Sequence, residues 1–389
     1  MIRQFIISLF FLFFFFPAIA QVNDGVYKAS KMEKGRELPE IVQMKVLSLG
    51  NGITIYTEEE SKKPLDGTYH FEIYGNRRHI IGNFSKGLAQ GEWKEYMYSD
   101  LYRTYNFKNG QLDGKNYTLH NDGSNRDIST YKDGIIQHYI SYHANKQVEE
   151  EVFFDEEGSK HGKVISYNKD GEVVQEANYS HGLYHGPKIS LNSNGSKEIE
   201  PYNNGVYEGE YTQFYPNGNK QKNGSYIKDH KKEGKWTYWY ENGDIEMEEN
   251  YLKGKLQGEK RAYYPGGMPK YIEQYTDDKL NGSKINYDEE SNSIVSEATY
   301  VNGELDGEFK AYNNGVLWRE SLYKNGKMLR EKEYKNGKLN VLRLIDDTGR
   351  MVDVQQYNAA GQISHKNKEY RKPASIRLKE DASGIIDIE

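Results

Sequence analysis

Residues 251–275 have the sequence YLKGKLQGEKRAYYPGGMPKYIEQY, which contains the most informative pattern of the chain. Tyr251 is followed after three residues by Gly254 and after four more by Gly258, and a glycine pair stands near the middle. A Gly-Gly pair, like Asn-Gly or Asp-Gly, tolerates the positive φ angles of a tight hairpin turn. The stretch therefore predicts one β-hairpin between two tyrosines, with a chain reversal at each end.

The same pattern recurs with a period of about two dozen residues. Boundary tyrosines 23 to 25 residues apart stand at Tyr179, Tyr202, Tyr226, Tyr251, Tyr275, Tyr300 and Tyr323. The second glycine of the pattern recurs as Gly186, Gly209, Gly234, Gly258 and Gly307. This repetition predicts that each unit is one hairpin and that successive hairpins form a long antiparallel meander.

Turn chemistry also predicts the register within each hairpin. A two-residue loop at Asn242-Gly243 makes Tyr240 face Ile245. If pairs are counted outward from such a loop, glycines face boundary tyrosines, as in Gly209 and Tyr226, Gly234 and Tyr251, and Gly258 and Tyr275. We expect each ring to cover the gap that glycine leaves in its strand. The unit that begins at Tyr300 is one residue short before its turn, which predicts a bulge there.

The two ends of the chain differ from the repeat. Residues 1–20 combine a positive residue, Arg3, with an apolar run and a small-residue end, which is the pattern of a cleaved signal peptide. We therefore predict export to the periplasm or the cell exterior, with no membrane span in the mature chain. We assign residues 21–62 to a leading or cap segment, residues 63–340 to the repeat array, and residues 341–389 to a C-terminal cap and polar tail.

Composition excludes several classes of function. The chain has 389 residues and no cysteine, which excludes a disulfide scaffold, a thiolate zinc site and a cysteine nucleophile. Without Arg3 the 52 basic residues become 51, and against 58 acidic residues they give the mature chain a net charge of −7. A mildly acidic chain without a dominant basic block binds polyanions poorly, so we expect no nucleic-acid partner.

The unit Tyr-x-x-Gly-x-x-x-Gly-x-x-x-x-aromatic-Tyr-x-Asn-Gly, clearest in residues 202–226 and 251–275, resembles the bacterial MORN-repeat-variant family. The resemblance covers most of residues 63–340. It implies an all-β fold: an elongated antiparallel meander or solenoid of tandem two-stranded hairpins, about 24 residues per repeat. It also implies a binding or scaffolding surface without a catalytic centre. Some relatives are labelled antitoxin components of toxin–antitoxin pairs.

No motif in the sequence favours catalysis or cofactor binding. Asp347-Thr348-Gly349 matches the aspartic-protease tripeptide, but that chemistry needs two such loops, so a polar turn is the better interpretation. His181 and His185 lie four residues apart and could share a metal ion, but the sequence indicates no third ligand. We therefore predict a non-enzymatic protein with no catalytic residue, cofactor or metal.

Aromatic side chains remain as candidates for binding a partner. A single sheet cannot bury both of its faces in itself, and planar rings suit an apolar protein patch or the face of a sugar. The candidates are Trp93, Trp236, Trp239, Tyr240, Tyr263, Tyr264 and Trp318, with mutual packing along the array as the alternative. We predict a secreted or periplasmic protein-interaction scaffold. An immunity or antitoxin-type protein that neutralises a toxin and an envelope glycan-binding protein are the alternatives.

Overall fold

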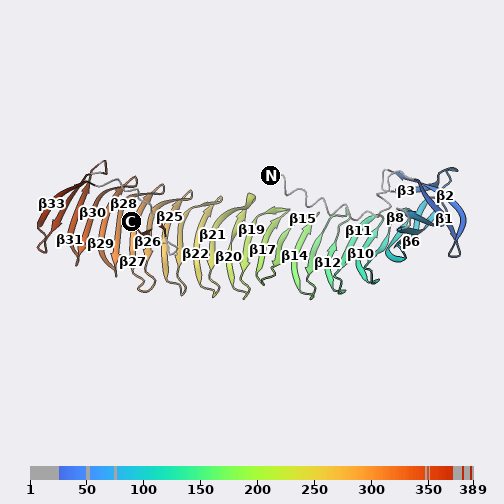
Figure 1. The fold of residues 1–389 in the computed structure, drawn as a ribbon, viewed down its shortest axis with the longest axis horizontal. Helices are drawn as coiled ribbons and strands as arrows, with labels where there is room; N and C mark the ends of the chain where they lie inside the picture. Colours follow the sequence, from blue (N-terminus) through green and yellow to red (C-terminus); the bar gives the residue numbers. More distant parts are fainter. Residues whose placement is uncertain are drawn as a thin grey trace. The chain divides into compact units, whose positions relative to one another are not determined.

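The computed structural model describes residues 26–49, 53–73, 77–346, 348–349, 351–370, 379–380 and 386–387, and the predicted signal peptide lies outside them. The chain forms two compact units, residues 1–188 and 189–389. In both units the described residues form antiparallel strands joined by short turns, so the predicted all-β meander is confirmed (Figure 1). Within these residues the one helical element is the 3-10 turn η1 (Lys228–His230), so no described segment forms a membrane-spanning helix.

From the fourth strand onward, the strands of the first unit follow chain order. They are β1 (Val26–Glu33), β2 (Arg36–Leu49), β3 (Ile53–Glu58), β4 (Gly67–Ile73), β5 (Arg78–Ser85), β6 (Leu88–Met97), β7 (Asp100–Lys108), β8 (Gln111–Leu112), β9 (Gly114–Leu119), β10 (Asn125–Lys132), β11 (Ile135–Tyr142), β12 (Val148–Phe153), β13 (Gly162–Tyr167), β14 (Val173–Ser180) and β15 (Leu183–Tyr184). The sheet begins in the order β3, β2, β1, β4. β16 (Gly186–Leu191) spans the division between the units.

The buried core of the first unit lies where residues 26–65 pack on the first hairpins. β1 pairs with both β2 and β4, which places Ala29 opposite Phe71. The core consists of Ala29, Tyr56, Leu65, Tyr69, Phe71, Ile80, Phe84, Ala89, Trp93 and Tyr105. Burial of so many aromatic rings supplies the main stabilisation at this end of the array.

The second unit continues the same antiparallel pattern. Its strands are β17 (Lys197–Asn203), β18 (Val206–Tyr207), β19 (Gly209–Phe214), β20 (Lys220–Ile227), β21 (Lys231–Trp239), β22 (Ile245–Leu252), β23 (Lys255–Leu256), β24 (Gly258–Tyr263), β25 (Pro269–Thr276), β26 (Lys279–Tyr287), β27 (Ile294–Val301), β28 (Glu304–Asn313), β29 (Val316–Lys324), β30 (Lys327–Lys335), β31 (Lys338–Ile345), β32 (Met351–Tyr357) and β33 (Ile363–Tyr370). The short strands β34 (Lys379–Glu380) and β35 (Ile386–Asp387) pair only with each other among the described residues.

Two kinds of turn alternate along most of the array, as far as Gly303. The reversal after a boundary tyrosine is a two-residue turn with both residues at positive φ, for example Asn302 (φ 53°) and Gly303 (φ 89°) between the paired residues Val301 and Glu304. These angles identify a type I′ turn, whose twist matches that of the flanking strands. The predicted reversal at the glycine three residues after the tyrosine is confirmed.

The turn in the middle of a unit is one residue longer than predicted. Tyr240 N–H donates to Asp244 O at 2.9 Å, and Gly243 N–H donates to Tyr240 O at 2.9 Å. The loop therefore contains Glu241, Asn242 and Gly243, and of these residues Gly243 alone has a positive φ, 95°. This is a type I turn closed by a left-handed glycine, a three-residue hairpin loop.

A bulge restores the predicted outer register of that hairpin. The expected pairing of Tyr240 with Ile245 is wrong, because Trp239 faces Ile245 and the register shifts between Tyr238 and Trp239. One residue added in the loop and one absorbed in the bulge cancel. The more distant pair, Gly234 and Tyr251, therefore keeps its predicted register.

The predicted glycine–tyrosine pairs are confirmed, but glycine stands there for a different reason than the one predicted. The pairs are Gly209 and Tyr226, Gly234 and Tyr251, and Gly258 and Tyr275, and the pattern recurs at Gly162 and Tyr179, Gly282 and Tyr300, and Gly307 and Tyr323. Gly258 has a φ of 83°, and a Cβ added to it would meet no atom within 4 Å. The backbone conformation therefore requires glycine there, and the tyrosine ring does not fill its gap.

Departures from the repeat are absorbed locally. Asp229, Asp278 and Asn292 replace turn glycines and adopt φ angles of 66°, 69° and 54°. Asn and Asp are the residues besides glycine that tolerate this left-handed region. In the short unit, Asn314 (φ 48°) and Gly315 form a two-residue turn, and the predicted bulge lies between Ala311 and Tyr312.

Candidate functional site

Charged side chains form a row across neighbouring strands of the second unit. The strand register places Lys260 on β24 opposite Glu273 on β25, and Glu273 opposite Lys284 on β26. Glu249 on β22 continues the series, because the pairs next to it align β22 with β24. We call Glu249, Lys260, Glu273 and Lys284 the charge row, and their side chains are only 7–19% exposed.

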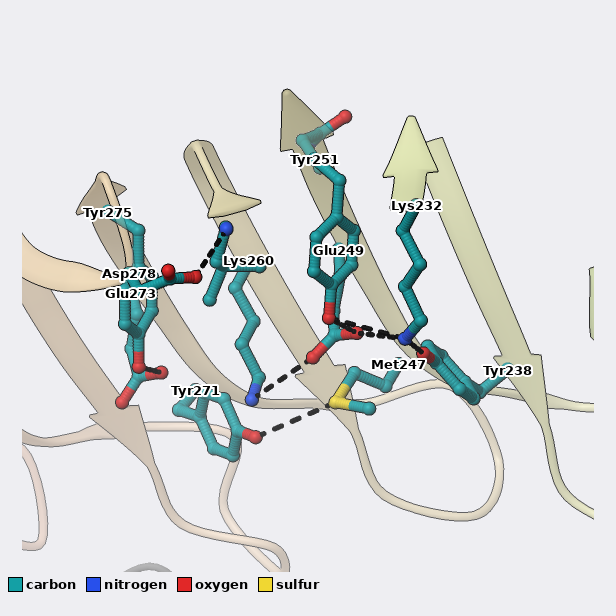
Figure 2. A network of polar contacts seen from close by, with 12 residues as sticks. Lys232, Tyr238, Met247, Glu249, Tyr251, Lys260, Tyr271, Glu273, Tyr275 and Asp278 are labelled. Atoms are coloured by element: carbon teal, nitrogen blue, oxygen red, sulfur yellow. Dashed lines mark hydrogen bonds and ion pairs between the residues drawn. The ribbon is translucent and has the colours of Figure 1, made fainter. Parts of the chain in front are cut away.

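The members of the charge row neutralise one another. Lys260 Nζ lies 3.3 Å from Glu249 Oε1, and Lys284 Nζ lies 2.9 Å from Glu273 Oε1. Each carboxylate also accepts a hydrogen bond from the boundary tyrosine two residues later, at 2.8 and 2.9 Å (Figure 2). Ion pairs with so little exposure are stable only when the remaining oxygens find donors, and the tyrosines supply them.

Lys232 on β21 extends the charge row at one end. Its Nζ donates to Tyr238 Oη at 2.6 Å and to Tyr251 Oη at 3.3 Å, and lies 3.9 Å from Glu249 Oε2 (Figure 2). The same ammonium group stands 4.6 Å from the ring centroid of Trp236, a cation–π distance. Burial lowers the pKa of Lys232, and Glu249 offsets part of that effect.

The tyrosines around the charge row remain protonated. Burial raises the pKa values of Tyr238 and Tyr251, and contact with the Glu249 carboxylate raises them further. Burial alone would lower the pKa of Lys260, but Tyr271 and Glu249 stabilise its charge and the net shift is upward. Because each charge in the row is matched, the arrangement is suited to holding strands together.

Two of the predicted partner-binding rings belong to the interior. Trp93 and Trp236 are 0% exposed. A Cβ added to Gly82 would lie 2.4 Å from the Trp93 ring, and one added to Gly224 would lie 2.2 Å from the Trp236 ring. Each indole N–H donates to a backbone oxygen on the same strand as that glycine, at 3.0 and 3.2 Å. Because they are fully buried, these rings have no surface for a partner. The sequence signal for this packing was the mid-strand glycine 11 or 12 residues before each Trp.

Tyrosines that precede the mid-unit turns link neighbouring hairpins. Tyr215 Oη donates to Trp239 O at 2.9 Å, Tyr240 Oη to Tyr263 O at 2.8 Å, and Tyr264 Oη to Tyr287 O at 3.2 Å. Four predicted binding residues, Trp239, Tyr240, Tyr263 and Tyr264, thus take part in a structural ladder and are half-buried. Sequence reasoning missed this role, although the spacing of Tyr215, Tyr240 and Tyr264, 25 and 24 residues, was visible.

Exposed apolar side chains lie at the edge of the second unit's sheet where the mid-unit turns are. Ile245, Met268, Val316 and Ile363 are 37%, 44%, 56% and 50% exposed, and each stands where a strand leaves such a turn. We call them the aliphatic turn row. Trp318, the most exposed predicted ring at 40%, follows Val316 on β29, with the Arg319 guanidinium 4.8 Å from its ring centroid.

The structure also places the two motifs for which the sequence favoured a structural interpretation over catalysis or metal binding. His181 lies beside Asp155 and Glu157. Each of the three side chains offers one potential ligand atom, and these atoms all lie within 4.8 Å of one another. His185 is not part of this group. Asp347 lies outside the described residues. Thr348 N–H donates to Asp346 Oδ1 at 3.1 Å, as expected for a polar turn.

One comparison with known proteins, that with family models, agrees with the repeat. The family model described as MORN repeat variant matches residues 160–181, 207–228 and 232–253, which confirms the resemblance over these three repeats. No curated protein matches the chain. Solved structures that match include a mutant of S. aureus TarM in complex with fondaparinux, alpha-GlcNAc-glycerol and UDP, at 12% identity and a TM-score of 0.17. That match covers 27% of this chain and 21% of TarM.

Proposed function

We propose that this chain, with its MORN-variant repeats, is an exported, non-enzymatic scaffold that binds another protein. The aliphatic turn row carries the proposal. Its four side chains do not contribute to a described core, and they lie along one edge of the second unit at successive intervals of one, two and two hairpins. Aligned exposed apolar residues with polar neighbours are typical of protein interaction sites.

Export is the second part of the proposal. It rests on the basic, apolar and small-residue segments of residues 1–20. Mass spectrometry of the protein recovered from cell fractions tests it. We expect a mature N-terminus at Gln21 in the periplasmic or extracellular fraction, whereas an uncleaved chain in the cytoplasm would contradict export.

Affinity purification from envelope extract tests the binding surface. We expect a protein partner to bind the mature chain and to be lost when Ile245, Met268 and Val316 are changed together to serine. A matched control changes Leu183, Leu252 and Val301 to serine; these are 51%, 51% and 44% exposed beside the turns at the opposite ends of the hairpins. Equal recovery of the partner with both triple variants would contradict the proposed surface.

An immunity role is a narrower form of this proposal, in which the partner is a toxin. Its motive is the labelling of some MORN-variant proteins as antitoxins. Co-expression with a toxin encoded beside this chain should restore growth, and the serine variant of the aliphatic turn row should not. No rescue in the compartment where both proteins reside would contradict the immunity role.

Glycan binding is the second candidate because Trp318 keeps 40% of its surface exposed. Planar indole rings bind sugar faces by stacking. Trp318→Ala should then abolish retention on immobilised envelope glycan, while Trp239→Ala, at a half-buried ring, should retain it. Equal retention by wild type and Trp318→Ala would contradict this candidate.

A further inference from the structure

An acidic loop and a histidine turn meet in the first unit. In the β12–β13 connection Gly158 stands four positions after Phe154, whereas Gly254 stands three positions after Tyr251, so this loop is one residue longer. The loop carries Asp155 and Glu157. His181, in the turn after β14, places its Nδ1 3.0 Å from Asp155 Oδ2.

The spacing of these atoms fits a transition-metal ion. Ligands about 2.0–2.1 Å from a tetrahedral Zn²⁺ lie about 3.3 Å from each other, close to the separation of His181 Nδ1 and Asp155 Oδ2. The Glu157 carboxylate supplies a third ligand atom within 4.8 Å of the other two. A second imidazole, that of His161, has its ring centroid 5.8 Å from that of His181. A set of imidazole and carboxylate ligands suits Zn²⁺ better than Mg²⁺.

Asp155 is oriented toward the ion position by its own loop. Its Oδ1 accepts hydrogen bonds from Ser159 N–H at 2.8 Å and from Glu157 N–H at 3.1 Å, which leaves Oδ2 facing His181. The His181 side chain is 69% exposed, which gives an ion access from solvent.

We propose that Asp155, Glu157 and His181 bind one Zn²⁺ ion, with His161 placed to complete four-coordination, and that the ion ties the β12–β13 loop to the β14–β15 turn. Sequence spacing could not indicate this set because Asp155 and His181 lie 26 residues apart and meet only through strand pairing. The site shares no residue with the aliphatic turn row and does not depend on the proposed protein binding.

Isothermal titration of ZnCl₂ into the full mature chain, first freed of metal by a chelator, tests the site. We expect one Zn²⁺ per chain with a Kd of about 1–10 µM and no binding of Mg²⁺ under the same conditions. Zn²⁺ should also raise the melting temperature, because it binds the folded state in preference to the unfolded chain.

Three variants make the test specific. His181→Asn and Asp155→Asn should each weaken Zn²⁺ binding at least about tenfold, or about 1.4 kcal/mol. Both should fold, because Asn204 holds the equivalent turn position at φ 48° and Asn168 Oδ1 accepts the same pair of loop hydrogen bonds. His185→Asn should bind like wild type. The proposal is overturned if wild type binds no Zn²⁺. It is also overturned if wild type, His181→Asn and Asp155→Asn bind Zn²⁺ equally, because that result indicates adventitious binding elsewhere.

Discussion

The indole ring of Trp236 covers Gly224 so closely that a Cβ on the glycine would lie 2.2 Å from Trp236 Cδ2. The register of β20 with β21 shifts at Gly224, but its φ angle is not positive, so its lack of a side chain is required by the ring and not by its φ angle. Trp93 covers Gly82 in the same way in the first unit. A tryptophan on a mid-strand glycine is thus a packing device that both units use.

Replacing that glycine should destabilise the protein. Gly224→Ala forces the Trp236 ring away from its strand, and we expect a loss of about 1–3 kcal/mol in the free energy of unfolding, as for other overpacked cores. Urea denaturation measures the loss. The control is Ser225→Ala, an exposed neighbour that should change stability by less than about 0.5 kcal/mol. Wild-type stability of Gly224→Ala would show that the ring does not lie on the glycine.

Removing a carboxylate from the charge row should lower the free energy of unfolding more than removing an exposed carboxylate does. Glu249→Ala deprives Lys232 and Lys260 of their carboxylate and Tyr251 of its acceptor. We expect a loss of about 2–4 kcal/mol, somewhat below the range for fully buried pairs because both lysines keep some solvent access. Glu246→Ala, at an exposed position of β22, should cost less than about 0.5 kcal/mol. Equal urea midpoints for the two variants would mean that the row does not stabilise the sheet.

Acidification should weaken the first unit through His79. Burial, together with the neighbouring His70, lowers the pKa of His79, and nearby glutamates only partly offset this. The unfolded chain, with a histidine pKa of about 6.5, therefore binds a proton more readily than the folded chain. The stability that comes from keeping His79 neutral is fully present above about pH 6.5. It is lost as the pH falls from about 6.5 through the lower pKa of His79 in the folded chain.

Melting temperatures at several pH values between about 7 and 5 test this effect. The melting temperature of wild type should fall over the range, and His79→Gln should fall less. His365→Gln, at an exposed position of β33, should follow the wild-type curve. A wild-type curve that rises on acidification, or a His79→Gln curve identical to it, would contradict the assignment.

The two kinds of turn should respond in opposite ways to glycine. Asn314 has a φ of 48°, so Asn314→Gly should be neutral within about 0.5 kcal/mol or slightly stabilising. Asn242 is not left-handed, and its Oδ1 accepts the Asp244 N–H at 3.0 Å. Asn242→Gly removes this hydrogen bond and increases the conformational entropy of the unfolded chain. We therefore expect a loss of about 1 kcal/mol in the free energy of unfolding. Equal urea midpoints for the two variants would mean that both turns are of one type.

The sequence predicts strand order and outer register because glycine and tyrosine recur at fixed spacing. It could not predict the mid-unit loop, since a type I′ turn and a three-residue loop with a bulge both accept Asn242-Gly243 and leave Gly234 opposite Tyr251. The charge row could not be predicted from the sequence either. Glu249 and Lys260 look like parts of a solvated charged surface until strand pairing brings them together.

Formation of an engineered disulfide tests whether Gly258 lies opposite Tyr275 in an antiparallel hairpin. The chain has no natural cysteine. The adjacent positions Glu259 and Gln274 are paired, and their side chains meet at 3.1 Å. Glu259→Cys with Gln274→Cys should therefore form an intramolecular disulfide under mild oxidation, detected by mass spectrometry.

The comparison pair is Glu259→Cys with Thr276→Cys, whose Cβ atoms should lie about 7–8 Å apart on the diagonal, beyond disulfide reach. A disulfide in the first pair and not in the second is the predicted result. A disulfide in the second pair and none in the first would place the strands two residues out of register and contradict the fold.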